Sequence, residues 1–164
     1  MVLLDAGTQE RFANLFPAYP SRNLPAGKGL GARTEAVAEN ALIAIVDDDR
    51  WMRGSLERLL RSAGLTTQTF ASAEDYLNAS NYDEFTCIIL DISLPGMSGF
   101  DLDRLLAAEE RRLPIVFVSA NDEPEVRQEA VQAGAVAFFG KPYEDNSLLN
   151  AVHTALKLAE IKNQ

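Results

Sequence analysis

Five short runs typical of strands, four of them apolar, recur from residue 42 onward, and segments with helical spacing separate them. The runs are residues 42–46, 65–70, 86–90, 114–118 and 135–139. Uninterrupted runs of this length are typical of parallel strands that are buried on both faces. Between and after them, apolar residues stand three and four positions apart, as in amphipathic helices, over residues 50–63, 72–79, 100–109, 124–133 and 145–161.

Glycine and serine residues mark the ends of several of these predicted helices. Gly64 and Gly134 follow the first and fourth helices, where a C-terminal cap is expected. Ser72 and Ser98 precede the second and third helices and can accept hydrogen bonds from free amides there. Strands that alternate with helices over short connections predict an α/β fold, a doubly wound five-stranded parallel sheet with strand order 2-1-3-4-5.

Residues 1–40 show no sustained period of either kind and contain several proline and glycine residues. This composition predicts an N-terminal extension or linker that is partly flexible, with the folded domain at residues 41–162. A short helix near residues 8–16 fits the spacing of Phe12, Leu15 and Phe16.

Charge and cysteine content exclude several classes of protein. The 164 residues carry a net charge of -9, and because residues 1–40 are balanced, the excess lies in the predicted domain. An acidic body argues against direct nucleic-acid binding. Cys87 is the only cysteine, which indicates a reducing compartment such as the cytoplasm. The chain start lacks the features of a signal peptide, and no run approaches the roughly 18 apolar residues of a membrane span.

Polar residues follow four of the five predicted strands. Asp47 and Asp48 come after the first strand, Asp91 after the third, Ser119 after the fourth and Lys141 after the fifth. In the order 2-1-3-4-5 the first and third strands are neighbours at the point where the winding reverses, so the three carboxylates are expected to meet.

Such a group of side chains predicts a site for phosphoryl transfer. Carboxylates without histidine or cysteine favour Mg²⁺ over zinc. A carboxylate nucleophile, a magnesium ion, a hydroxyl and an ammonium group together can hold a phosphoryl group while it is transferred.

The chain resembles a known family, the receiver domain of two-component response regulators, which has a flavodoxin-like fold. The resemblance covers residues 41 to about 160, and its motifs are Ile45-Val46-Asp47-Asp48-Asp49, residues 90–99 around Asp91, Val118-Ser119-Ala120, Ala133-Gly134-Ala135 and Phe139-Gly140-Lys141-Pro142.

The resemblance implies a role for each residue of the site. Asp91 would be the phosphoacceptor, Ser119 the switch hydroxyl, Lys141 the cation that pairs with phosphate and Phe138 the switch aromatic. The Mg²⁺ ligands would be Asp47, Asp48, Asp91 and the backbone carbonyl of Ser93. The family also implies that the protein catalyses only its own phosphorylation and dephosphorylation, so an enzyme in the usual sense is not expected.

Residues 53–60 and 69–73 are most similar to nitrogen-fixation transcription regulators, which normally continue into a DNA-binding domain. This chain stops, so we expect a single-domain response regulator, a cytoplasmic phosphoprotein without direct nucleic-acid or membrane contacts. Its phosphoryl donor would be a sensor histidine kinase or a phosphotransfer protein. Its output surface would be the face formed by the fourth helix, fifth strand and fifth helix, about residues 123–161, which would bind a partner or a second copy. A receiver cut from a longer protein also stays open.

Two other functions remain as alternatives. A degenerate receiver would act as a docking module independent of phosphorylation, although Asp47, Asp48, Asp91 and Lys141 are all in place. A magnesium-dependent phosphohydrolase would also use an aspartate nucleophile. Against it, Ser93 stands where an Asp-x-Asp hydrolase has its general acid.

Several smaller assignments complete the sequence-based interpretation. Phe138 fits a plain core position as well as a switch. Asp49 is expected to cap the first helix rather than bind metal. The resemblance implies a cis Lys141-Pro142 peptide bond, whereas the general frequency of cis proline bonds predicts a trans bond. His153 is expected to be an ordinary helix residue, and Ser93 and Asn121 to tune the lifetime of the phosphoryl group.

Overall fold

A five-stranded parallel sheet in the order β2-β1-β3-β4-β5 forms the centre of the computed structural model, which describes residues 40–162. The strands are β1 (Leu42–Val46), β2 (Thr66–Phe70), β3 (Cys87–Asp91), β4 (Ile115–Ser119) and β5 (Ala137–Gly140). The predicted fold class and strand order are therefore confirmed. The short helix expected near residues 8–16 lies outside the described residues.

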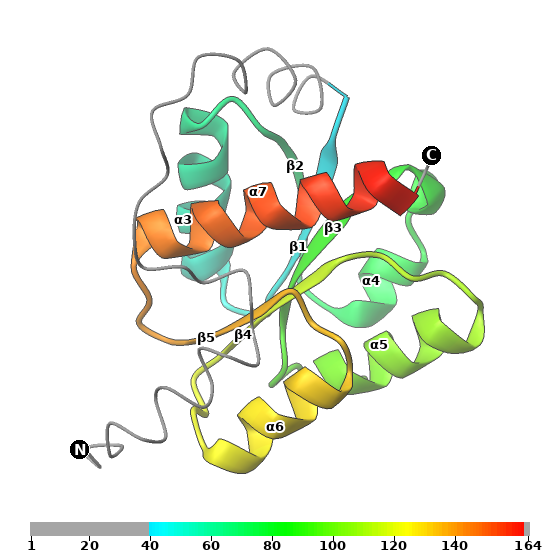
Figure 1. Cartoon of the computed structure of the whole chain (residues 1–164), viewed down its shortest axis with the longest axis vertical. Helices are drawn as coiled ribbons and strands as arrows, with labels where there is room; N and C mark the ends of the chain where they lie inside the picture. Colours follow the sequence, from blue (N-terminus) through cyan, green and yellow to red (C-terminus); the bar gives the residue numbers. More distant parts are fainter. Residues whose placement is uncertain (1–39, 163–164) are drawn as a thin grey trace.

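Helices cover both faces of this sheet (Figure 1). The structure has α3 (Arg50–Ser62), α4 (Ala73–Leu77), α5 (Gly99–Ala108), α6 (Pro124–Gln132) and α7 (Asp145–Lys162). All five agree with the predicted segments to within a few residues. A short 3-10 helix, η1 (Tyr82–Glu84), was not predicted, because three residues are too few for a helical period.

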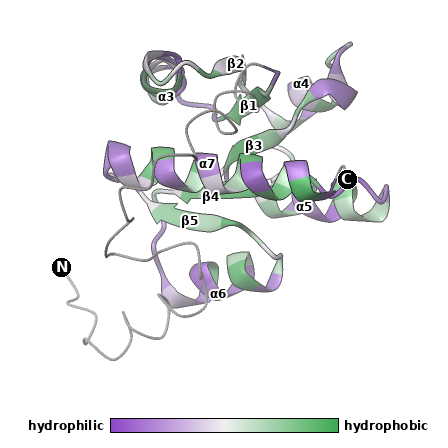
Figure 2. Cartoon of the chain, turned by 45° about the horizontal axis from the view of Figure 1, so that its top comes forward, coloured by the Kyte–Doolittle hydropathy of each residue, from purple (hydrophilic) through white to green (hydrophobic). Residues whose placement is uncertain are grey.

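The core consists of two layers, one on each side of the sheet. Ile88 and Leu90 of β3 pack in the layer under α4, α5 and α6, whereas Ile89 packs in the layer under α3 and α7. This alternation follows from the two-residue period of a strand. Phe138 and Phe139 of β5 lie in opposite layers for the same reason. In Figure 2 the strands are mostly green, while the helices carry both colours.

The predicted helix caps are present. The Ser72 hydroxyl accepts a hydrogen bond from the Asp75 amide at 3.0 Å, which starts α4. Ser98 and Asp101 form a capping box at the start of α5. Gly64 and Gly134 have φ values of +79° and +77°, a backbone conformation that glycine adopts without strain.

An aromatic cluster fixes the short helix α4 to the sheet. Tyr76 is fully buried, and its ring lies 5.5 Å from that of Phe70 and 5.3 Å from that of Phe85, measured between centroids. The contact with Phe70 is edge-to-face, an arrangement that adds to the stability gained by burial. Because a helix of five residues would not be stable alone, this anchor determines where α4 lies.

No helix within residues 40–162 combines the length and the apolar character needed to span a membrane.

Two glycine-to-alanine substitutions test how closely α5 packs against the end of β3. A Cβ atom at Gly99, the first residue of α5, would lie 2.5 Å from the Asp91 carbonyl oxygen, so Gly99→Ala should lower the free energy of unfolding by about 1–3 kcal/mol. Gly54, within α3, has no atom inside 4 Å of such a Cβ. Gly54→Ala should therefore raise the free energy of unfolding by about 0.5–1 kcal/mol. Urea unfolding measures both, and equal effects would contradict the close packing of Gly99.

Candidate functional site

Two buried carboxylates meet where β1 and β3 end side by side. Val46 pairs with Leu90, so Asp47, which follows β1, lies next to Asp91, the last residue of β3. Their exposed fractions are 0% for Asp47 and 4% for Asp91. Asp48 is exposed, and one oxygen from each of Asp47, Asp48 and Asp91 lies within 4.8 Å of the others. The structure thus brings together the three acidic residues that the sequence placed at this edge.

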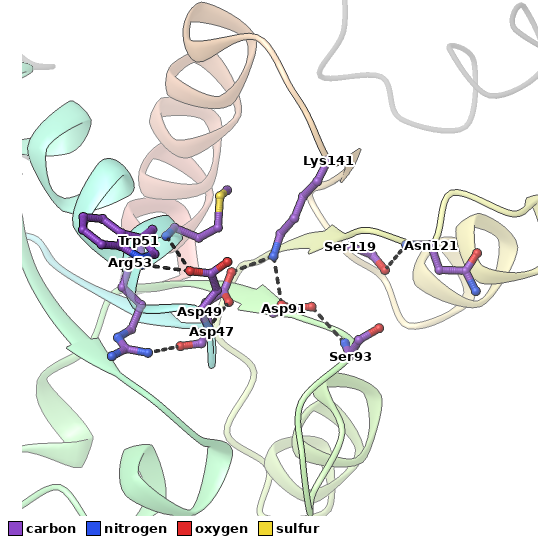
Figure 3. Close-up of polar contacts among 10 residues, drawn as sticks. Asp47, Asp49, Trp51, Arg53, Asp91, Ser93, Ser119, Asn121 and Lys141 are labelled. Atoms are coloured by element: carbon purple, nitrogen blue, oxygen red, sulfur yellow. Dashed lines mark hydrogen bonds and ion pairs between the residues drawn. The ribbon is translucent and has the colours of Figure 1, made fainter. Parts of the chain in front are cut away.

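Lys141 extends between the two buried carboxylates (Figure 3). It follows β5, and its Nζ atom lies 2.8 Å from Asp47 Oδ2 and 2.9 Å from Asp91 Oδ2. The Lys141 amide donates to the Ser119 carbonyl oxygen at 2.8 Å, which fixes the start of the side chain beside β4. The Lys141-Pro142 peptide bond is cis, so the family resemblance predicted its isomer and the general frequency of proline bonds did not.

Burial and ion pairing act in opposite directions on these groups. Burial raises the pKa of Asp47, and its hydrogen bonds to Lys141 and to the Asp49 amide counteract this only in part. Burial also opposes the charge of Lys141, but its bonds to Asp47 and Asp91 outweigh that effect and raise its pKa above the ordinary value. The ammonium group is therefore held in its charged form between two anions.

The other predicted site residues surround Asp91. The Ser93 amide donates to Asp91 Oδ1 at 2.9 Å, so both carboxylate oxygens of Asp91 already accept hydrogen bonds. Ser119 is fully buried at the end of β4, and its hydroxyl oxygen accepts from the Asn121 amide at 3.0 Å. Figure 3 shows Ser93, Ser119 and Asn121 on the side of Asp91 that faces away from Asp47.

Asp49 caps α3, as predicted. Its Oδ1 atom accepts hydrogen bonds from the amides of Trp51 at 2.8 Å and Met52 at 3.3 Å. This ties the carboxylate to the helix terminus, and it is not among the three acidic residues of the cluster. Trp51 is 79% exposed near the same edge of the sheet, which suits it as a fluorescent reporter.

Phe138 is buried in the core, and the guanidinium of Arg127 lies over its ring at 4.9 Å from the centroid. Arg127 also forms an ion pair with Asp122 in the loop after β4. Arg127 was not predicted as a functional residue, because its spacing on α6 only indicates a surface residue. His153 is half-buried on α7, where burial and then the charge of Lys157 lower its pKa.

Two further residues next to the site were also missed. Arg53 of α3 donates from its guanidinium to the Asp47 carbonyl oxygen at 2.7 Å. Glu74 of α4 accepts a hydrogen bond from the Met97 amide at 2.9 Å, in the loop after Asp91. The helical spacing after Asp49 could have placed Arg53 near Asp47, but no local pattern connects Glu74 with Met97.

Residues 43–153 match the response regulator receiver domain family. The chain belongs to this family. It is 41% identical over 121 residues to the response regulator protein TmoT of Ectopseudomonas mendocina, a match that covers 74% of this chain and 55% of TmoT. It is 35% identical over 118 residues to the transcriptional regulatory protein FixJ of Bradyrhizobium diazoefficiens, over 72% of this chain and 58% of FixJ.

Solved receiver structures agree with the fold. The low-resolution structure of the response regulator StyR gives a TM-score of 0.69 at 39% identity, and the match covers 76% of this chain and 63% of StyR. The likeness to FixJ confirms the expected relation to nitrogen-fixation regulators. The chain spans little more than half the length of its curated relatives, 55% of TmoT and 58% of FixJ.

The raised pKa of Asp47 in this receiver domain predicts a characteristic pH dependence of stability. As the pH rises from the ordinary aspartate value of 3.8, the unfolded chain loses this proton before the folded chain does. Ionisation of Asp47 then favours unfolding, so its stabilising contribution falls as the pH rises through its folded pKa.

Asp47→Asn removes this titration. We therefore expect the free energy of unfolding of Asp47→Asn, relative to that of the wild type, to increase as the pH is raised from 3.8 towards neutrality. Urea unfolding in EDTA at a series of pH values measures the difference. A relative stability that stays constant or falls would contradict the raised pKa.

Proposed function

We propose that this receiver domain is a phosphorylation-dependent switch, and that Asp91 accepts a phosphoryl group from a histidine kinase or a phosphotransfer protein. The observation that carries the proposal is the position of Asp91, which is nearly buried beside Asp47 and 2.9 Å from the Lys141 ammonium. The family membership supports it, since receiver domains interact with histidine kinases.

The residues at this edge suit Mg²⁺. The group consists of three carboxylates whose oxygens lie within 4.8 Å of one another, and it contains no histidine or cysteine. Oxygen donors of this kind favour a hard cation. Asp47, Asp48 and Asp91 would hold the ion together with the Ser93 carbonyl oxygen. When bound, Mg²⁺ would neutralise oxygens of the phosphoryl group.

In the proposed reaction an Asp91 carboxylate oxygen attacks phosphorus. The new oxygen-phosphorus bond forms as the bond between phosphorus and the imidazole nitrogen of the donor phosphohistidine breaks, and the electron pair of that bond stays on the nitrogen. Lys141 pairs with the added negative charge, and the Ser119 hydroxyl donates to a phosphoryl oxygen. Water later hydrolyses the acyl phosphate, and Ser93 and Asn121, which stand two positions after Asp91 and Ser119 respectively, tune that rate.

The switch that follows involves Ser119 and Phe138. In the proposal, phosphorylation draws the Ser119 hydroxyl towards Asp91, and Phe138 repacks in response. Both residues lie in β-strands next to α6, so the change would reach the face formed by α6, β5 and α7. That face would bind a protein partner or a second copy of the chain.

The proposal extends to the organisation of the chain. Residues 41–162 would be the receiver domain, and residues 1–40 an extension. The switch would act in the cytoplasm, where the buried free thiol of Cys87 stays reduced. The net charge of -9 argues against direct contact with nucleic acid.

Ligand titrations followed by Trp51 fluorescence test the proposed switch. Adding Mg²⁺ should change the signal, and adding beryllofluoride, a mimic of the aspartyl phosphate, should change it again. Asp91→Asn should abolish the second step, because the acceptor oxygen is replaced by an amide. Calorimetry measures the same two steps independently of Trp51.

Each alternative function predicts a different result. A docking module would bind its partner equally well with Asp91→Asn, and a wild type that binds neither Mg²⁺ nor beryllofluoride would contradict the switch. A phosphohydrolase would turn over small phosphate esters in many cycles, whereas the switch accepts one phosphoryl group per chain.

Replacing Lys141 should separate cation binding from anion binding. Lys141→Met removes the ammonium that now pairs with Asp47 and Asp91, so we expect Mg²⁺ to bind at least about threefold more tightly. Beryllofluoride should bind more weakly, because its negative charge loses a partner. Lys157→Met, on an exposed position of α7, is the control for the change in net charge. Parallel weakening of both ligands would contradict the proposed role of Lys141.

A further inference from the structure

The loop that joins β3 to α5, residues 92–98, leads directly away from Asp91. Its start is held by the hydrogen bond from the Ser93 amide to Asp91 Oδ1, and its end by the Ser98 capping box of α5. Among the described residues, one hydrogen bond joins residues 93–98 to an element other than β3 and α5. In that bond the Met97 amide donates to Glu74 Oε1 at 2.9 Å.

Glu74 packs directly on the backbone of this loop. A Cβ atom at Gly96 would lie 2.8 Å from Glu74 Oε1, so the carboxylate occupies the space that any larger residue at position 96 would need. Gly96 has a φ of +75°, which turns the chain so that the next amide, that of Met97, points at Glu74. The hydrogen bond from Met97 is also the main reason why the pKa of Glu74 is lowered.

Glu74 can hold the loop because α4 is itself fixed. Ala73 and Tyr76, two other residues of α4, have no exposed surface and anchor this short helix in the core. Tyr76 belongs to the aromatic cluster with Phe70 and Phe85. The position of Glu74 relative to the sheet is therefore set by the core, although its carboxylate faces solvent.

We propose that Glu74 is a positioning residue for phosphorylation: its hydrogen bond to Met97 holds the loop after Asp91 in the arrangement in which the Ser93 carbonyl oxygen can bind Mg²⁺. This rests on the proposed function of the site. Without this hydrogen bond the centre of the loop is free to move. Part of the binding free energy of the ligands must then be used to order the loop again, so both ligands bind more weakly.

Affinity measurements on four proteins test this role. Calorimetry gives the dissociation constants for Mg²⁺ and for beryllofluoride with the wild type, Glu74→Ala, Glu74→Gln and Asp75→Ala. Asp75→Ala is the matched control, because it removes the same charge from the next residue of α4, whose side chain is exposed and has no hydrogen bond to the loop among the described residues. Glu74→Gln keeps an oxygen that can accept from Met97 without the charge.

We expect Glu74→Ala to weaken the binding of both ligands by about three- to tenfold relative to Asp75→Ala, up to the lower end of the range for outer residues of metal sites. Glu74→Gln should restore most of the loss. Hydrogen exchange adds a readout that needs no ligand, because the Met97 amide should exchange faster in Glu74→Ala and should keep its wild-type rate in Asp75→Ala. Urea unfolding should show that both variants remain folded, with Glu74→Ala slightly less stable than Asp75→Ala because only Glu74→Ala loses the hydrogen bond to Met97.

Three results would overturn the proposal for Glu74. These are equal affinities in Glu74→Ala and Asp75→Ala, no recovery in Glu74→Gln, or an unchanged exchange rate at Met97. A wild type that binds neither ligand would instead overturn the proposed function, and the proposal on Glu74 with it. The Met97 exchange rates would then still report whether the contact with Glu74 exists, so the two failures can be told apart.

Discussion

The ion pairs of Lys141 with Asp47 and Asp91 are the interaction on which the rest of the site depends. Two carboxylates with almost no exposed surface lie next to each other, and such a pair is unstable without a compensating cation. Lys141 supplies that charge from the end of β5, on the far side of β4. Any ligand that enters must replace or share these contacts, so binding of a cation or an anion is coupled to the position of one side chain.

The sequence was sufficient for the fold and for most of the site, and the reason is topological. Continuous apolar strands, each followed by a polar residue, can be arranged as a parallel sheet in few ways, and every such sheet brings the strand ends to one edge. Asp47, Asp91, Ser119 and Lys141 were placed together by this argument before any distance was known. The expected cap at Asp49 followed from its place directly before the first helix.

What the sequence did not reveal are individual contacts that a side chain of one element makes with another element. Arg53 reaches the Asp47 carbonyl oxygen, Arg127 covers Phe138, and Glu74 accepts from Met97 across 23 positions of sequence. Each depends on how two elements are placed in three dimensions, and helical spacing identifies these residues only as surface positions.

The most direct test of the central claim is the intact mass of the protein after incubation with Mg²⁺ and the small phosphodonor acetyl phosphate. The account predicts that the wild type gains the mass of one phosphoryl group, that the modification is lost on mild alkaline hydrolysis as expected for an acyl phosphate, and that Asp91→Asn gains nothing. An unmodified wild type, or an equal gain of mass in Asp91→Asn, would contradict the assignment of Asp91 as the phosphoacceptor.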